Sequence, residues 1–282
     1  MYKLLFFMGK IMGYLPVGLV ERCSWGLAVV LFDVVRMRRG LILKNLTTAF
    51  GDELTPKRRL KVGRRSLYHF ILSICEFFRS VTLKIDRDIE MVGRTHIDEA
   101  LKQGKGVYVL CFHMGNWEAM GAKYSNDIVP SPILVKKVGH GGVSRFVDDL
   151  RDKNNFMTVK RQKKGDGMKA IQEILDRNEV VGFVIDQARP GEPRLPFFGE
   201  PAKTNTSFAA IWRRHPAPII PSFILRKGLD SHVLHFLPPV DLKVTQDADK
   251  DILSHSTIFN QVVESVIRKC PEQYFWLHNR WK

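Results

Sequence analysis

The chain has 282 residues, a length that suits one large α/β domain or two small domains with a sizeable core. Its 44 lysines and arginines outnumber 29 acidic residues, which gives a formal net charge of +15. Such a balance indicates an anionic partner, and charge alone does not choose among nucleic acid, an anionic membrane surface and an acidic carrier protein. The four cysteines form no C-x-x-C pair, so the sequence indicates neither a zinc site nor a disulfide framework.

The first 40 residues are strongly apolar but interrupted. The run 4–20 contains Lys10 and Pro16, and the run 23–32 ends at Asp33. Neither run reaches the ~20 uncharged apolar residues of a clean membrane span. A tilted span, a hairpin that dips into one leaflet and a buried core helix all stay open. Basic residues follow at once, which favours attachment at the cytoplasmic side. We predict that residues 1–40 form a membrane-associated helical segment and that residues 41–282 form an α/β domain.

A long helix is predicted to begin after Thr55, which is a good N-cap and is followed by Pro56 at the first helical position. Its first half is crowded with positive charge, and this cluster is either a solvated face or a surface for lipid headgroups or an acidic partner. The cluster consists of Arg58, Arg59, Lys61, Arg64 and Arg65. Glu76 lies in the apolar second half, so its carboxylate must be paired or close to solvent.

From about residue 92 the chain alternates between short apolar runs, typical of strands, and longer stretches typical of helices. The predicted strands are 107–112, 132–136, 180–185, 218–225 and 232–237. The predicted helices are 116–125, 142–154, 167–177, 204–214 and 252–269. This alternation predicts an α/β fold with a central, mostly parallel or mixed sheet covered by helices on both faces.

Function in such sheets gathers where the strands end, and His113 and Asp186 each follow an apolar strand. The stretch HMGNWE (113–118) also places Glu118 five residues after the histidine. In one helix the two side chains would diverge by about 140°, but a turn at Gly115–Asn116 that feeds a helix from Trp117 would let them converge. A histidine beside a carboxylate is a general base with its orienting group, although a purely structural histidine is the plainer alternative.

Other catalytic chemistries find little support in the sequence. The nucleophile elbow G-x-S-x-G, the P-loop and the dinucleotide-binding fingerprint are absent. No second histidine or cysteine falls at metal-ligand spacing around His113, so we expect no metal. If the motif is catalytic, the histidine is expected to activate a hydroxyl group on a bound substrate for direct attack.

Five sequence blocks, in the same order, resemble the lipid A biosynthesis (late) acyltransferases, which transfer a fatty acyl chain from acyl carrier protein to a lipid A precursor. The resemblance runs from about Asn45 to Lys282. The blocks are KNLTTAF (44–50), GKGVYVLCFHMGNWE (104–118), RNEVVGFVIDQ (177–187), PFFGEPAKTNT (196–206) and PEQYFWLHNRWK (271–282). The second block contains the H-x4-D/E acyltransferase motif.

The resemblance implies a role for individual residues. His113 would be the general base and Glu118 its partner, while Gly115, Asn116 and Trp117 would shape the turn. Substrate-binding residues are expected to be Asn116, Arg151, Asp186, Gln187 and Lys137. Arg151 matches a basic residue of the family, but Arg145 is close enough to leave the choice open. Lys136 or Lys137 would replace an arginine of the family and could not reproduce its bidentate grip on phosphate.

The resemblance also implies a glycerol-phosphate-acyltransferase-like fold and an acyltransferase that forms no acyl-enzyme and needs no cofactor beyond the acyl donor. The expected partners are acyl carrier protein, a membrane lipid acceptor and an anionic membrane surface, at the cytoplasmic face of the bacterial inner membrane. One alternative is a related H-x4-D/E acyltransferase acting on another glycolipid, an aminolipid or a glycerol phosphate. A basic nucleic-acid-binding protein is disfavoured by the apolar N-terminus and by the lack of a basic-aromatic motif, so we expect no nucleic-acid partner.

Overall fold

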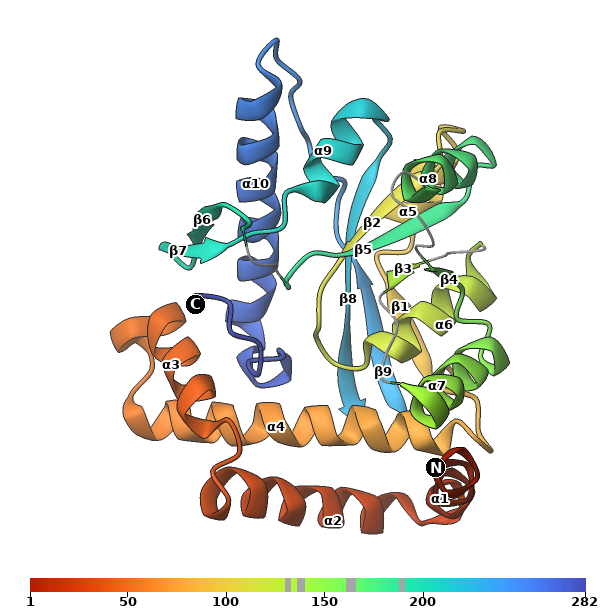
Figure 1. Ribbon diagram of the computed structural model, residues 1–282, viewed down its shortest axis with the longest axis vertical. Coiled ribbons are helices and arrows are strands. Elements are labelled where there is room, and N and C mark those ends of the chain that lie inside the picture. Colours follow the sequence, from red (N-terminus) through yellow and green to blue (C-terminus); the bar gives the residue numbers. More distant parts are fainter. Residues whose placement is uncertain (130–132, 136–139, 161–165, 188–190) are drawn as a thin grey trace.

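The computed structural model describes residues 1–129, 133–135, 140–160, 166–187 and 191–282, with side chains left out at 133–135, 158–160 and 166. Within this part a seven-stranded sheet has the order β1-β9-β8-β2-β5-β3-β4 (Figure 1). Its strands are β1 (Ile89–Val92), β2 (Val107–Cys111), β3 (Ile133–Val135), β4 (Thr158–Lys160), β5 (Val180–Val184), β8 (Ile219–Gly228) and β9 (Ser231–Phe236). All neighbours pair in parallel except β8 and β9, so the sheet is mixed, as the sequence predicts.

Helices cover both faces of this sheet because the side chains of its central strand alternate between two apolar clusters. Tyr108 and Leu110 of β2 face α8 (Asp166–Asp176), α9 (Ser207–Arg214) and α10 (Ala248–Lys269). Val107, Val109 and Cys111 face α5 (Thr95–Leu101) and α6 (Trp117–Asp127). A small hairpin of β6 (Arg194–Phe197) and β7 (Glu200–Lys203) lies apart from the sheet beside α10. The predicted two-sided α/β architecture is therefore confirmed.

Some predicted elements differ from the structure. The strand β1, the strand β4 and the β6–β7 hairpin are not predicted from the sequence, because their strands are three or four residues long and lack a clear apolar alternation. The helix predicted at 204–214 begins only at Ser207. Residues 204–206 form a connection after β7, in which the N–H of Thr204 donates to the carbonyl oxygen of Pro193 and Asn205 Oδ1 accepts from the N–H of Ser207.

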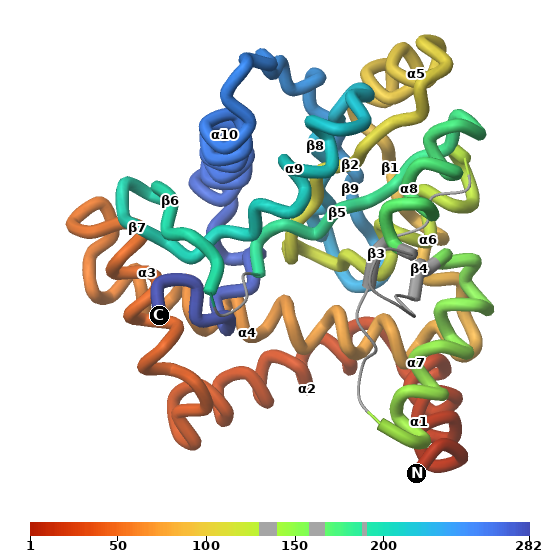
Figure 2. Tube along the Cα trace, turned by 45° about the horizontal axis from the view of Figure 1, so that its top comes forward, coloured from red at the N-terminus to blue at the C-terminus, as the bar shows by residue number. Residues whose placement is uncertain are grey.

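The long helix α4 (Pro56–Arg79) crosses the end of the sheet where β8 finishes (Figure 1). The predicted cap is present, since Thr55 Oγ1 accepts a hydrogen bond from the backbone N–H of Arg58 at 3.3 Å. Two shorter helices, α1 (Tyr2–Tyr14) and α2 (Val17–Val29), pack against α4, and α1 also contacts α7 (Gly141–Lys153), as Figure 2 shows. The helix α3 (Arg39–Phe50) follows, so the predicted boundary at residue 40 falls inside a helix.

The N-terminal helices have two different apolar faces. One face joins the core, with Val20, Ala28 and Phe32 almost completely buried. The other face is open to solvent along α1, α2 and the π-helical turn η1 (Val30–Val34). Its exposed apolar residues include Leu4, Phe7, Met8, Ile11, Leu19, Leu27, Val30 and Val34. In the described part of the chain, each helix is too short or too polar to cross a bilayer.

Candidate active site

The turn that the sequence predicts after β2 is present. The five residues of β2 are all buried, and α6 begins at Trp117. Asn116 is the N-cap of α6, because its Oδ1 accepts a hydrogen bond from the N–H of Ala119 at 3.1 Å. Gly115 has φ +57°, and a Cβ at this position would lie 2.2 Å from the carbonyl oxygen of Ile224. Only glycine fits this turn, for both conformational and steric reasons.

The imidazole of His113 is held by Asp186. Its Nδ1 lies 2.8 Å from Asp186 Oδ1, and the backbone N–H of His113 donates to Asp186 Oδ2 at 3.0 Å. The sheet brings them together, since β2 and β5 are parallel neighbours with Cys111 opposite Val184, and two more residues along each strand lead to this pair. An ionised carboxylate only accepts hydrogen bonds, so Nδ1 carries the proton and Nε2 is the free base.

The charges around this pair reinforce one another. Burial by itself favours the neutral ring, but the charge of Asp186, its hydrogen bond and the charge of Glu118 outweigh burial and raise the pKa of His113 above 6.5. Burial likewise disfavours the carboxylate of Asp186, yet the charge and hydrogen bonds of His113 and the charge of Arg280 lower the pKa of Asp186. The His113 side chain remains 19% exposed, whereas that of Asp186 is 3% exposed. The imidazole of His113 is thus accessible from solvent, whereas the carboxylate of Asp186 is buried.

Glu118 does not orient the histidine, so this sequence-based prediction is wrong. Arg151 of α7 holds Glu118 in a bidentate ion pair, with Nε and Nη2 donating at 2.9 and 2.6 Å. No hydrogen bond joins His113 to Glu118 in the described part of the chain. The turn and the helix start at Trp117 are as predicted, but in the first turn of α6 the Glu118 carboxylate faces Arg151 of α7 rather than the end of β2.

The remaining predicted site residues have different outcomes. Arg151, not Arg145, reaches the motif, since Arg145 is exposed, pairs with Asp149 and lies over the Tyr2 ring. Asn116 cannot contact a substrate as predicted, because it is fully buried and both its polar groups are engaged within the protein. Gln187 places its Nε2 3.4 Å from each ring nitrogen of His113. Lys136 and Lys137 lie outside the described residues.

A wall of the site comes from the C-terminal segment, which the sequence analysis quoted as a block without giving it a role. The N–H of Phe275 donates to the carbonyl oxygen of His113 at 3.0 Å, and Tyr274 forms a β-bridge with Met114. The Phe275 ring lies 5.8 Å from the imidazole, and the Trp117 ring lies 4.9 Å from it. Partly exposed aromatic rings therefore flank the reachable edge of the base.

The arrangement suits proton transfer by the imidazole of His113 without a nucleophilic side chain beside it. In the described residues His113 is hydrogen bonded to no serine, threonine or cysteine side chain, and no cluster of metal-ligating side chains is found. Cys111 is near in sequence, but it is buried, and burial raises the pKa of its thiol. The geometry is thus that of an oriented imidazole with one ring nitrogen able to accept a proton.

Sequence comparisons with known proteins all point to acyltransferases. The profile of the bacterial lipid A biosynthesis acyltransferase family matches residues 2–282. The lipid A biosynthesis lauroyltransferase of Escherichia coli (strain K12) is 25% identical over 278 residues, which are 95% of this chain and 87% of that protein. The lipid A biosynthesis palmitoleoyltransferase of the same organism is 21% identical over 253 residues, 88% of this chain and 80% of that protein. A lipid A biosynthesis acyltransferase of Shigella flexneri gives the same values.

One solved structure is also similar. The 1-acyl-sn-glycerophosphate acyltransferase of Thermotoga maritima matches with a TM-score of 0.37 and 11% identity, over 87% of this chain and 98% of that chain. A similarity of this size is too weak to carry an inference.

Proposed function

The chain belongs to the bacterial lipid A biosynthesis acyltransferase family, and on that premise we propose that it transfers a fatty acyl chain from acyl carrier protein to a hydroxyl group of a lipid A precursor. The observation that carries the proposal is the oriented base of the H-x4-E motif, His113, at the end of a buried strand with Asp186 behind it. The acyl carrier protein is proposed as donor because a chain of net charge +15 would steer an acidic partner toward it.

The proposed reaction proceeds in one ternary complex. His113 Nε2 accepts the proton of the acceptor hydroxyl while that oxygen bonds to the carbonyl carbon of the thioester. The carbon–sulfur bond then breaks, and the imidazolium returns the proton to the departing thiolate. Asp186 holds the tautomer and stabilises the imidazolium between these two steps. No acyl-enzyme and no cofactor are needed.

The pair of Glu118 and Arg151 has a different place in this proposal. The charge of Glu118 helps to raise the pKa of His113, and Arg151 keeps that carboxylate fixed. The Arg151 side chain is only 9% exposed, so it would bind substrate only if the pair opened. Gln187 is exposed beside the imidazole and is proposed to contact the substrate, and Lys137 stays a predicted substrate contact.

The N-terminal helices are proposed to lie in the cytoplasmic leaflet of the inner membrane, where a lipid acceptor resides. The support is the exposed apolar face along α1, α2 and η1, because exposed apolar residues gathered on consecutive helices are typical of a membrane contact. Exposed Arg36, Arg58, Lys61 and Arg65 add positive charge that anionic headgroups would attract. Arg65 and Trp25 also line an open cavity of about 480 Å³ between α2, α4 and the C-terminal turn Pro271–Gln273.

The protein is expected to stay with membranes after a high-salt wash, because apolar burial does not depend on ionic strength. Replacing Phe7 and Ile11 of the exposed face with glutamate should release most of it into the soluble fraction. Leu253→Glu, at an exposed apolar position on α10, is the matched control and should leave fractionation unchanged. Complete release of the parent protein by salt alone would show that attachment is only electrostatic.

The acceptor is tested by mass spectrometry of lipid A from a strain that lacks this gene. We expect the loss of one secondary acyl chain, restored by the parent gene but not by a gene encoding His113→Ala. An unchanged lipid A mass would contradict the proposed acceptor and direct the search to another glycolipid, an aminolipid or a glycerol phosphate. Transfer from purified acyl carrier protein substrates to the isolated precursor then tests the donor.

A further inference from the structure

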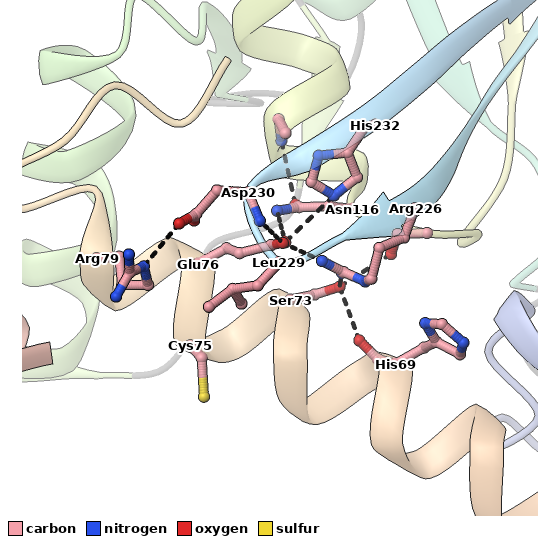
Figure 3. A network of polar contacts seen from close by, with 12 residues as sticks. His69, Ser73, Cys75, Glu76, Arg79, Asn116, Arg226, Leu229, Asp230 and His232 are labelled. Atoms are coloured by element: carbon pink, nitrogen blue, oxygen red, sulfur yellow. Dashed lines mark hydrogen bonds and ion pairs between the residues drawn. The ribbon is translucent and has the colours of Figure 1, made fainter. Parts of the chain in front are cut away.

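A buried carboxylate lies at the centre of a polar network between α4 and the catalytic turn (Figure 3). Glu76 of α4 is 2% exposed and accepts hydrogen bonds from three other parts of the chain. Its Oε1 accepts from Arg226 Nη1 and from the backbone N–H of Asp230, the latter at 2.8 Å. Its Oε2 accepts from Asn116 Nδ2 at 2.6 Å and lies 3.4 Å from Nε2 of His232 in β9. Oε1 thus contacts only the β8–β9 hairpin, whereas Oε2 is the oxygen that reaches the turn.

The bond to Asn116 fixes the start of α6. Asn116 Nδ2 donates to Glu76 while its Oδ1 accepts from the N–H of Ala119, so the amide has one permitted orientation. A second line reaches the same turn, since Arg226 Nη2 donates to Ser73 Oγ at 2.9 Å and Ser73 Oγ donates to the Gly115 carbonyl at 2.9 Å. Both lines end within three residues of His113.

Stability alone is a poor explanation for this network. Replacing a buried ion pair with packed apolar residues is often neutral or stabilising, so such pairs are weak evidence for a stabilising role. Burial by itself would raise the pKa of Glu76, but the charge of Arg226, contacts with His232 and the Asp230 N–H lower it to about 2. The carboxylate is therefore ionised at every physiological pH, and it provides a fixed, directional acceptor for Asn116.

We propose that Glu76 is a positioning residue of the active site, which acts through Asn116 to fix the turn that presents His113 to the acceptor hydroxyl. This inference rests on the proposed function. A misplacement of about 1 Å can lower a rate by roughly 100-fold, so loosening this turn should lower kcat without removing the base.

Because only Oε2 reaches the turn, a reciprocal test is possible. In Glu76→Gln the amide oxygen can still accept from Arg226 and Asp230, but its NH₂ group then faces the NH₂ group of Asn116 as well as the His232 ring. In Asn116→Asp the cap of α6 is kept, but two carboxylates face each other. The double variant restores a donor opposite an acceptor, with the polarity reversed and the same net charge as the parent.

We expect each single variant to lose roughly 10- to 100-fold in kcat with less than about a threefold change in KM, and the double variant to recover most of that loss. Thermal melting accompanies each assay. The control is Asp251→Asn, which removes another buried carboxylate. Asp251 lies on α10 and pairs with Arg213 of α9, so its replacement should lower stability without changing kcat. Single variants within about twofold of the parent, or a folded double variant no better than the worse single one, would overturn the proposal.

A readout independent of acyl transfer separates this inference from the proposed function. NMR spectra of histidine-labelled protein, with the His113 signals assigned by their loss in His113→Ala, report the imidazole directly. We expect these signals to shift in both single variants and to return toward the parent in the double variant. If the parent protein fails to acylate a lipid A precursor, the proposed function fails, and unshifted His113 signals would still overturn the role of Glu76.

Discussion

Replacing His113 with alanine should lower kcat by at least about two orders of magnitude while leaving the fold unchanged. Loss of a general base typically costs 10²- to 10⁴-fold in rate. The side chain is partly exposed and fills no core position, so its removal should not unfold the protein. Acyl transfer with saturating donor and acceptor measures the loss, and circular dichroism checks the fold.

The control for this variant is His96→Ala. His96 is partly exposed on α5, which precedes β2 and therefore lies toward the amino end of that strand. Its removal should leave kcat within about twofold of the parent. Near-normal turnover by His113→Ala, or a trapped acyl group on any residue of the protein, would contradict the mechanism while leaving the family membership intact.

The position of the proposed base, His113, was predictable from the sequence. The buried run before His113 and the turn at Gly115–Asn116 that leads into a helix each follow from local rules of strands and turns. The structure agrees with both. The strand ends also marked Asp186 as a site residue, because strand C-terminal ends meet at one edge of a parallel sheet.

The partner of the base was not predictable in the same way. Glu118 is close to His113 in sequence, whereas Asp186 becomes its neighbour only through the order and register of β2 and β5. Strand order depends on packing among distant segments, and apolar periodicity does not report it. The same holds for Glu76, which the sequence analysis recognised as a carboxylate in need of a partner, because Arg226 lies 150 positions further along the chain.

The pH dependence of kcat/KM should carry the signature of this pair. The base works only when neutral, so kcat/KM should rise with pH through the pKa of His113 and flatten above it. Because Asp186 and Glu118 raise that pKa, the midpoint of the acid limb should lie above 6.5. Removing the charge of Asp186 should move the midpoint to lower pH, since burial of the ring would then favour its neutral form.

Asp186→Asn should therefore lower kcat by about two to four orders of magnitude in spite of having a nearly identical shape. The backbone N–H of His113 needs an acceptor, so the asparagine oxygen would take the place of Oδ2. Its NH₂ group would then face Nδ1, which forces the ring proton onto Nε2 and leaves no free base toward the substrate.

Glu118→Gln is the comparison that separates the structural assignment from the sequence-based one. Its side chain bonds Arg151 rather than the imidazole, so the tautomer of His113 should survive and the loss should be smaller, on the order of tenfold. Parallel assays of both variants at several pH values, with thermal melting as a check on folding, decide the matter. A Glu118→Gln enzyme that is more impaired than Asp186→Asn would return the orienting role to Glu118 and leave Asp186 as a merely structural neighbour.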